Sequence, residues 1–221
     1  MSVLAIVISA TVLLGDSYVK AASAVDKEPV QMFNGTDLSG WVVEGVRSFP
    51  KGDKRISVWE AKDGMIVCSG WGFGFLRFDA ELSDFRFTME YRLAKKGNSG
   101  VGIRGIPFTG AKATRPSFAG YEIQLLDDAG SPTNAHSSGS LYRYVPPLVN
   151  AVKPAGEWNT FEVECRGPKI RVKINGEIVQ DVDQTTVAEI KDKPLRGYVS
   201  LQNHGHKVEF RNLQYVPLGT E

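Results

Sequence analysis

Hydrophobic and polar side chains alternate with a period of two along most of the chain. Successive side chains of a β-strand point to opposite faces, so this period is typical of strands with one buried face. The alternation predicts strands over residues 56–61, 64–69, 73–78, 84–94, 100–105, 120–126, 140–144, 157–166, 169–174, 177–181, 196–204 and 207–217. No long amphipathic helix is indicated, and residues 185–190 are expected to form a helical turn.

Turn residues separate these strands and indicate how they are connected. Asn175-Gly176 lies between RVKI and EIVQ, and Asn-Gly takes the positive φ values of a type I′ hairpin turn. Asp63-Gly64 predicts a second hairpin. About a dozen short strands with regularly spaced turns predict an all-β protein, a β-sandwich folded as a single domain over residues 25–221.

Two connections are longer than the others and flank one strand. Residues 105–119 precede the segment YEIQL (121–125), and residues 127–139 follow it. Long loops without structure of their own are commonly functional or mobile. The surroundings of YEIQL are therefore the first place to expect a binding site.

Four of the predicted strands have polar side chains on one face. In YEIQL, Tyr121, Ile123 and Leu125 share the core face, which leaves Glu122 and Gln124 on the other. The same alternation places Arg104 on the outer face of residues 98–105, and Gln202 and His204 on the outer face of residues 197–205. It places Glu90 on the outer face of residues 85–93. If these strands are neighbours, their side chains form a polar floor suited to sugar hydroxyls, above which Gly100 and Gly102 leave room for a ring. The alternative is a solvated face with scattered ion pairs.

Individual residues suggest several kinds of chemistry. His204 is favoured over His206 as a general base or ligand, whereas His136 lies in a long loop and could close over a ligand. Glu122, Asp127 and His204 are candidate ligands for a divalent cation, although their spacing matches no EF-hand or zinc motif. Glu122 and Glu90 could also form the carboxylate pair of an ordinary glycosidase.

The N-terminus and the composition restrict location and partners. The apolar run 3–15 followed by Ala22-Ser23-Ala24 resembles a signal peptide (residues 1–24) cleaved after Ala24, which predicts export to the periplasm or the medium with no membrane span remaining. The alternative is an uncleaved membrane anchor. Lys and Arg number 26 against 25 Asp and Glu, a balance that argues against nucleic acid as a partner. Cys68 and Cys165 are expected to be buried thiols or one disulfide.

Several segments of the chain resemble one known family, the 3-keto-disaccharide hydrolase domains. They are MFNGTDLSGW (32–41), NSGVGIR (98–104), YEIQLLDD (121–128), SGSLYRYVPP (138–147), KPAGEWNTFEVECRGPKIRVKINGEIV (153–179) and GYVSLQNHGHKVEFRNLQYVPL (197–218). The resemblance extends from about residue 30 to 218 and implies a jelly-roll sandwich of two antiparallel sheets, of the concanavalin A-like lectin and glucanase type. It also implies that the concave sheet holds carbohydrate.

The resemblance implies a site and a reaction. The family's polar concave-face positions correspond to Arg104, Glu122, Gln124, Asp127, Tyr142, Gln202 and His204. The implied reaction cleaves the glycosidic bond of a 3-keto-glycoside by removal of the C2 proton, elimination and hydration. His204 or Glu122 would be the base, Arg104 or a bound divalent cation would stabilise the oxyanion, and Tyr142 would donate to the leaving oxygen. The alternatives are a non-catalytic carbohydrate-binding module of the same fold and an ordinary glycosidase.

Overall fold

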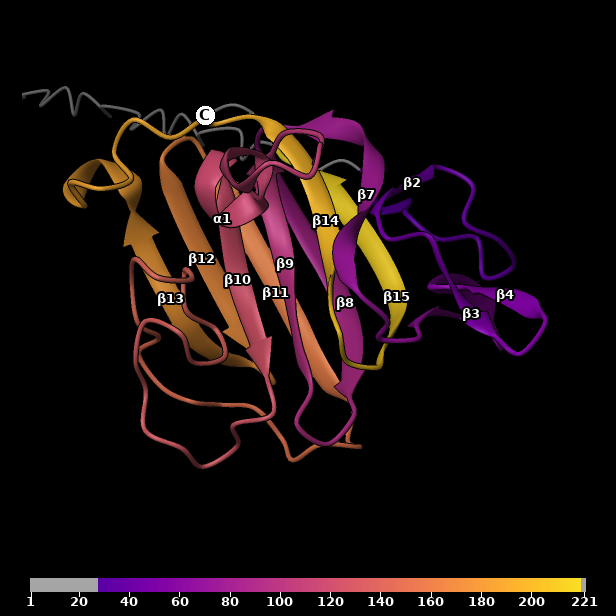
Figure 1. The fold of residues 1–221 in the computed structure, drawn as a ribbon. Coiled ribbons are helices and arrows are strands. Elements are labelled where there is room, and N and C mark those ends of the chain that lie inside the picture. Colours follow the sequence, from indigo (N-terminus) through magenta and orange to yellow (C-terminus); the bar gives the residue numbers. More distant parts are fainter. Residues whose placement is uncertain (1–27, 220–221) are drawn as a thin grey trace, which may run out of the picture.

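The computed structural model describes residues 28–219, which form two antiparallel sheets packed face to face (Figure 1). The larger sheet has the strand order β13 (Glu177–Asp183), β12 (Lys169–Ile174), β11 (Asn159–Arg166), β8 (Phe85–Leu93), β15 (Val208–Pro217), β6 (Met65–Cys68) and β5 (Trp59–Lys62), and β1 (Val30–Gln31) pairs with β15. The smaller sheet has the order β10 (Tyr121–Leu126), β9 (Asn98–Gly105), β14 (Gly197–His204), β7 (Phe73–Leu82) and β2 (Trp41–Gly45). The predicted β-sandwich is confirmed.

Short elements complete the fold. Strands β3 (Ser48–Lys51) and β4 (Lys54–Ser57) form a separate two-stranded ribbon at one side of the sandwich. The helix α1 (Pro116–Ala119) and the 3₁₀ turn η1 (Lys112–Thr114) lie in the connection between β9 and β10, and a second 3₁₀ turn, η2 (Gln184–Thr186), follows β13. Residues 185–190 were expected to form a helical turn, and η2 overlaps the start of this segment, whereas α1 was not expected. Pro116 at its first position explains it, because the ring presets a helical φ and needs no hydrogen bond there.

The hydrophobic core lies between the two sheets. On β8, Phe85, Phe87, Met89 and Tyr91 are buried and alternate with polar residues that point away from the core. The apolar side chains of β10 meet them from the smaller sheet, and Ile123 is fully buried. The period-two alternation therefore identifies the core-facing side chains of both strands correctly.

Two predicted hairpin turns are present and one predicted strand is absent. Asn175 and Gly176 have φ values of 53° and 87°, and Asp63 and Gly64 have φ values of 52° and 73°, as a tight hairpin requires. Residues 140–144 are not a strand. Leu141 makes only isolated bridges, and the φ of 68° at Arg143 turns the chain away.

Both cysteines are buried free thiols, Cys68 on β6 and Cys165 on β11. Burial raises the pKa of each thiol to about 12, which keeps both protonated. Within residues 28–219 no helix is long and apolar enough to cross a membrane. The predicted signal peptide and its cleavage position lie outside the described residues.

Candidate functional site

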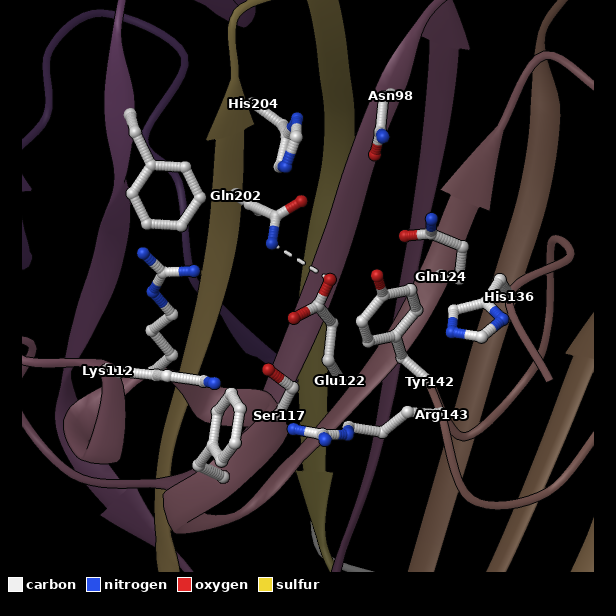
Figure 2. Close-up of a pocket in the computed structure, with 13 residues that line it drawn as sticks. Asn98, Lys112, Ser117, Glu122, Gln124, His136, Tyr142, Arg143, Gln202 and His204 are labelled. Carbon is white, nitrogen blue, oxygen red and sulfur yellow. Dashed lines mark hydrogen bonds between the residues drawn. The ribbon is translucent and has the colours of Figure 1, made fainter.

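A pocket with a volume of about 270 Å³ lies on the face of the smaller sheet that points away from the core (Figure 2). Strands of the sheet form its floor, and the two long loops that flank β10 form its walls. The residues that line it are Phe73, Asn98, Lys112, Arg115, Ser117, Phe118, Glu122, Gln124, His136, Tyr142, Arg143, Gln202 and His204. The sequence predicted five of these as site residues: Glu122, Gln124, Tyr142, Gln202 and His204.

Glu122 and Gln202 meet across the strand that separates them. β9 lies between β10 and β14, and Gln202 Nε2 donates a hydrogen bond of 2.8 Å to Glu122 Oε1. A Cβ atom at Gly100 of β9 would lie 3.0 Å from Glu122 Cγ and 3.1 Å from Glu122 Oε1. The lack of a side chain at Gly100 is therefore what leaves space for this hydrogen bond.

The expected role of the glycines on β9 was wrong. They were expected to leave room for a sugar ring, but protein atoms fill that space. Glu122 lies over Gly100, whereas a Cβ atom at Gly102 would collide with Ser200 Oγ and with Pro116 of α1. Gly102 thus allows α1 to pack closely on the sheet, which places the residues around α1 beside Glu122.

Glu122 is a buried carboxyl group, with 5% of its surface exposed. Burial raises its pKa from 4.5 to about 7, because a charged carboxylate loses its hydration in the pocket. Hydrogen bonds from Gln202 and from the Ser117 side chain, together with the positive charge of Arg115, oppose this rise. Such a carboxyl group can take up and release a proton near neutral pH.

Several polar atoms around Glu122 have no hydrogen-bond partner among the described residues. They include Gln124 Oε1, Gln202 Oε1, Asn98 Oδ1 and Arg115 Nε, all of which are buried. Buried polar atoms in proteins nearly always have a partner, so a group of exceptions at one pocket indicates a bound polar molecule or water. Three of these atoms are acceptors, which suits a molecule that carries several hydroxyl groups.

The walls of the pocket are held in place by contacts outside it. Lys193 Nζ donates to the carbonyl oxygens of Phe118 and Gly120, at 2.7 and 2.6 Å, and so fixes the end of α1. Tyr144 donates a hydrogen bond of 3.1 Å to the Ser117 carbonyl. Burial and the charge of Arg143 lower the pKa of Lys193 to about 8.

Aromatic rings and imidazoles border the pocket. His136 contacts Tyr142 edge to face, with ring centroids 5.0 Å apart, and Figure 2 shows both rings on the side of Gln124. On the other side, His204 is exposed and contacts Phe73 edge to face at 5.6 Å. His136 had only been expected as a loop residue that could close over a ligand, and the structure places it in the pocket wall.

Arg104 was predicted to lie in the polar floor, and this was wrong. Its φ of 53° is left-handed, and the pairing of β9 with β14 shifts register beside it, since Tyr198 pairs with Gly105 and Ser200 with Gly102. This β-bulge inserts a residue into β9 and turns the Arg104 side chain away from the face that alternation predicts. Arg104 is fully buried and donates to the Gly167 carbonyl at 2.7 Å.

Glu90 and Asp127 are also absent from the pocket. Glu90 lies on β8 of the larger sheet, where Arg211 Nη2 pairs with its carboxylate at 2.7 Å. Asp127 follows β10 and accepts a hydrogen bond of 2.8 Å from the Lys96 backbone, in the turn before β9. The outer face of the larger sheet carries further ion pairs, so the alternative of a solvated face describes that sheet.

The predicted cation ligands do not come together. Glu122 and His204 line the pocket, but Asp127 does not. Among residues 28–219, no group of three or more His, Cys, Asp or Glu side chains is arranged to hold a metal ion. Among the residues that line the pocket, amide and cationic side chains outnumber carboxyl groups.

Sequence reasoning did not identify Phe73, Asn98, Lys112, Arg115, Ser117, Phe118 and Arg143 as site residues. Five of them come from the two long loops or from the turn beyond them. For these five residues, the only signal in the sequence was the length of the loops on either side of YEIQL.

Comparisons with known proteins agree with the fold and place the chain in a family. A 3-keto-disaccharide hydrolase from Bacteroides thetaiotaomicron is 25% identical over an alignment of 251 residues that covers 90% of this chain and 84% of the relative. The structure of a protein assigned to the glycosyl hydrolases, from Parabacteroides distasonis, superposes with a TM-score of 0.69 at 22% identity, over 86% of this chain and 94% of the other. A laminarinase from Rhodothermus marinus superposes with a TM-score of 0.54 at 10% identity, over 88% of this chain and 97% of the other. These two likenesses show the fold.

The family assignment rests on the sequence itself. Residues 28–215 match the family described as the 3-keto-alpha-glucoside-1,2-lyase-like domain, which is nearly all of the part of the chain that the structure describes. The match includes every residue that lines the pocket. The chain belongs to the 3-keto-alpha-glucoside-1,2-lyase-like domain family.

Proposed function

We propose that the protein is a glycoside hydrolase that cleaves the glycosidic bond of 3-keto-glycosides by elimination and hydration. The observation that carries this proposal is that Glu122 is the one carboxyl group in the pocket lining formed by residues 28–219, and that burial raises its pKa to about 7. Membership of the family and the likeness to a 3-keto-disaccharide hydrolase support it.

A single carboxyl group suits elimination better than ordinary glycoside hydrolysis. Retaining and inverting glycosidases generally use two carboxyl groups that flank the scissile bond. Glu90, the predicted second carboxylate, lies on the larger sheet and is paired with Arg211. Elimination needs only one base at C2, which the pocket supplies.

The proposed reaction starts from the acidity that a C3 ketone gives to the C2 proton. A base removes this proton, and the electrons of the C2–H bond form the enolate of the ketone. The enolate then expels the oxygen on C1, which takes up a proton and leaves as an alcohol. Water adds to C1 of the resulting enone and a proton returns to C2, so the net reaction is hydrolysis.

The structure suggests a role for each side chain. Glu122 is the proposed base, because its pKa lets it accept a proton near neutral pH. Arg115 takes the place predicted for Arg104 as the cation near the developing enolate oxygen, since its charge acts on Glu122. Tyr142 is the proposed donor to the leaving oxygen, and His204 at the exposed edge is the alternative base.

Gln124 and Gln202 are the proposed sugar-orienting groups. Each presents a buried Oε1 atom without a partner, and such an atom can accept a hydrogen bond from a sugar hydroxyl. Gln202 also holds Glu122 through its Nε2 atom. Gln202 is thus proposed both to bind the substrate and to orient the base.

Incubation of the purified protein in D₂O with a 3-keto-disaccharide and, separately, with its unoxidised parent tests the proposal. Cleavage of the ketone alone, with deuterium appearing at C2 of the product, is the expected result by NMR. Cleavage of the parent would indicate an ordinary glycosidase, and binding without either cleavage or exchange would indicate a carbohydrate-binding module. Glu122→Gln should abolish the exchange, whereas Glu60→Gln at an exposed position on β5 should not.

A further inference from the structure

The pocket contains more positive charge than the proposed reaction needs. Lys112, Arg115 and Arg143 line it, against the single carboxyl group of Glu122. The whole chain, by contrast, has a formal net charge of only +1. If Arg115 serves the enolate, then Lys112 and Arg143 remain without a role.

Lys112 and Arg143 both contact the ring of Phe118. Lys112 Nζ lies 5.1 Å from the centroid of the Phe118 ring, and Arg143 Cζ lies 4.3 Å from it. Figure 2 shows the two side chains reaching from opposite sides toward the region beside Ser117. Both charged groups can therefore contact one small ligand group placed there.

Neither of these two cations has an acidic partner among the described residues. Other basic side chains on or beside the smaller sheet do, such as Arg77 of β7 with Glu44 at 2.7 Å and Arg196 before β14 with Glu81 at 2.6 Å. Lys193, itself fixed behind α1, has its pKa lowered in part by the charge of Arg143. The positive charges of Arg143 and Lys193 repel one another, and a bound anion would relieve this repulsion.

A further observation at the same pocket also indicates a ligand. Arg115 Nε is buried without a hydrogen-bond partner, although its guanidinium lies 4.6 Å from the centroid of the Phe73 ring. A buried, unpaired guanidinium donor is unfavourable unless a ligand or water accepts from it. Arg115, whose Nε atom has no acceptor, lines the same pocket as Lys112 and Arg143, which have no acidic partner among the described residues.

We infer that the substrate is an anionic glycoside, whose carboxylate or sulfate group binds between Lys112 and Arg143. This inference rests on the proposed function, which places C2 of the sugar at Glu122. With C2 at Glu122, the substituent on C5 is on the opposite side of the six-membered ring. If the C5 side of the ring lies toward Ser117, a uronic acid carboxylate, or a sulfate ester at C6, reaches the region between the two cations. Arginine and lysine are well suited to such oxyanions.

Three matched probes test the inference: a methyl glucoside, the corresponding methyl glucuronide, and the methyl glucoside 6-sulfate. Binding of the unoxidised probes is measured by calorimetry, and turnover is measured on their 3-keto forms. We expect at least one anionic probe to bind about tenfold or more tightly than the neutral probe, and this preference to shrink as NaCl is raised. Preference for the glucuronide alone, for the sulfate alone, or for both would identify which anion is recognised.

Variants locate the effect in the structure. Lys112→Gln combined with Arg143→Gln should remove the preference for the anion, so that the neutral and anionic probes bind about equally. Lys54→Gln combined with Lys62→Gln removes two exposed charges elsewhere and should retain the preference. Equal binding of neutral and anionic probes, or an unchanged preference in the Lys112/Arg143 variant, would overturn the inference. If the anionic probe binds more tightly but its 3-keto form is not cleaved, the proposed reaction fails while the anion site stands.

Discussion

Gln202 Nε2 and Glu122 Oε1 are 2.8 Å apart although the two residues belong to strands that are not neighbours. The strand between them, β9, has Gly100 at the point where their side chains meet. The Gln202 amide therefore donates a hydrogen bond to a carboxyl group that burial has removed from water. This hydrogen bond fixes the position of the proposed base, and its surroundings lead to the predictions below.

The first prediction concerns the carboxyl group of Glu122. Glu122→Gln keeps the size of the side chain but cannot take up the C2 proton, so turnover of a 3-keto-glycoside should fall by about 10²-fold or more. Because burial raises the pKa of Glu122 to about 7, wild-type kcat/KM should rise as pH increases through that value. Activity that instead falls through the same range would make Glu122 the acid. Full activity in the variant would remove Glu122 from the mechanism.

The second prediction concerns the glycine beneath this hydrogen bond. In Gly100→Ala the new Cβ atom would press on Glu122 Cγ at 3.0 Å and on Oε1 at 3.1 Å, so the Glu122 side chain must move, which disturbs its hydrogen bond with Gln202. Turnover should fall by about tenfold or more, because small displacements of catalytic groups are costly. Gly105→Ala on the same strand is the matched control. There the nearest atoms are 3.9 Å away, and activity should be retained. Equal activity in the two variants would contradict the proposed role of Gly100.

The fold and the floor of the site could be predicted because side-chain alternation depends only on the strand itself. Glu122, Gln124, Gln202 and His204 were placed on one polar face, and all four line the pocket. Alternation does not say which sheet a strand belongs to, however. Glu90 has the right parity but lies on β8 of the opposite sheet. The sheet to which a strand belongs is decided by its pairing with strands distant in sequence, which a local pattern does not reveal.

The walls of the site depend on packing that the sequence does not display. The position of Phe118 requires Lys193, which lies 75 residues farther along the chain and binds the backbone of α1. Arg104 was predicted on the wrong face of β9. Its left-handed conformation and the register shift between β9 and β14 interrupt the regular alternation of side chains there. A φ of 53° is uncommon for arginine, so the sequence does not indicate this conformation.

The third prediction separates Arg104 from the site. Because its guanidinium is buried and donates to the Gly167 carbonyl, Arg104→Leu should lower the free energy of unfolding by about 1–3 kcal/mol. The turnover number of the folded protein should remain unchanged, since Arg104 does not line the pocket. Urea unfolding and steady-state kinetics on the same sample measure both quantities. A large loss of turnover without loss of stability would restore Arg104 to the mechanism.

The fourth prediction concerns the residues before the described fold. The apolar run 3–15 and Ala22-Ser23-Ala24 motivate the proposal that the protein is exported and that its mature chain begins at Val25. Expression of the full chain followed by N-terminal sequencing of the exported protein should give Val25-Asp26. Recovery of membrane-bound protein that begins at Met1 would show an uncleaved anchor instead.

The last prediction concerns stability as a function of pH. The pKa of Glu122 is raised from 4.5 to about 7 in the folded protein, so the folded state holds a proton that the unfolded state has lost between these values. A group of this kind contributes stability that is fully present below pH 4.5 and is lost as pH rises through about 7. Glu122→Gln has no such proton. The free energy of unfolding of the wild type, measured relative to that of the variant, should therefore fall by at least about 1 kcal/mol between the two pH values. Urea unfolding of both proteins on either side of this range gives the difference directly, and contributions from all other groups cancel. A difference that is constant with pH would mean that the carboxyl group is solvated and that its pKa is not raised in the folded protein.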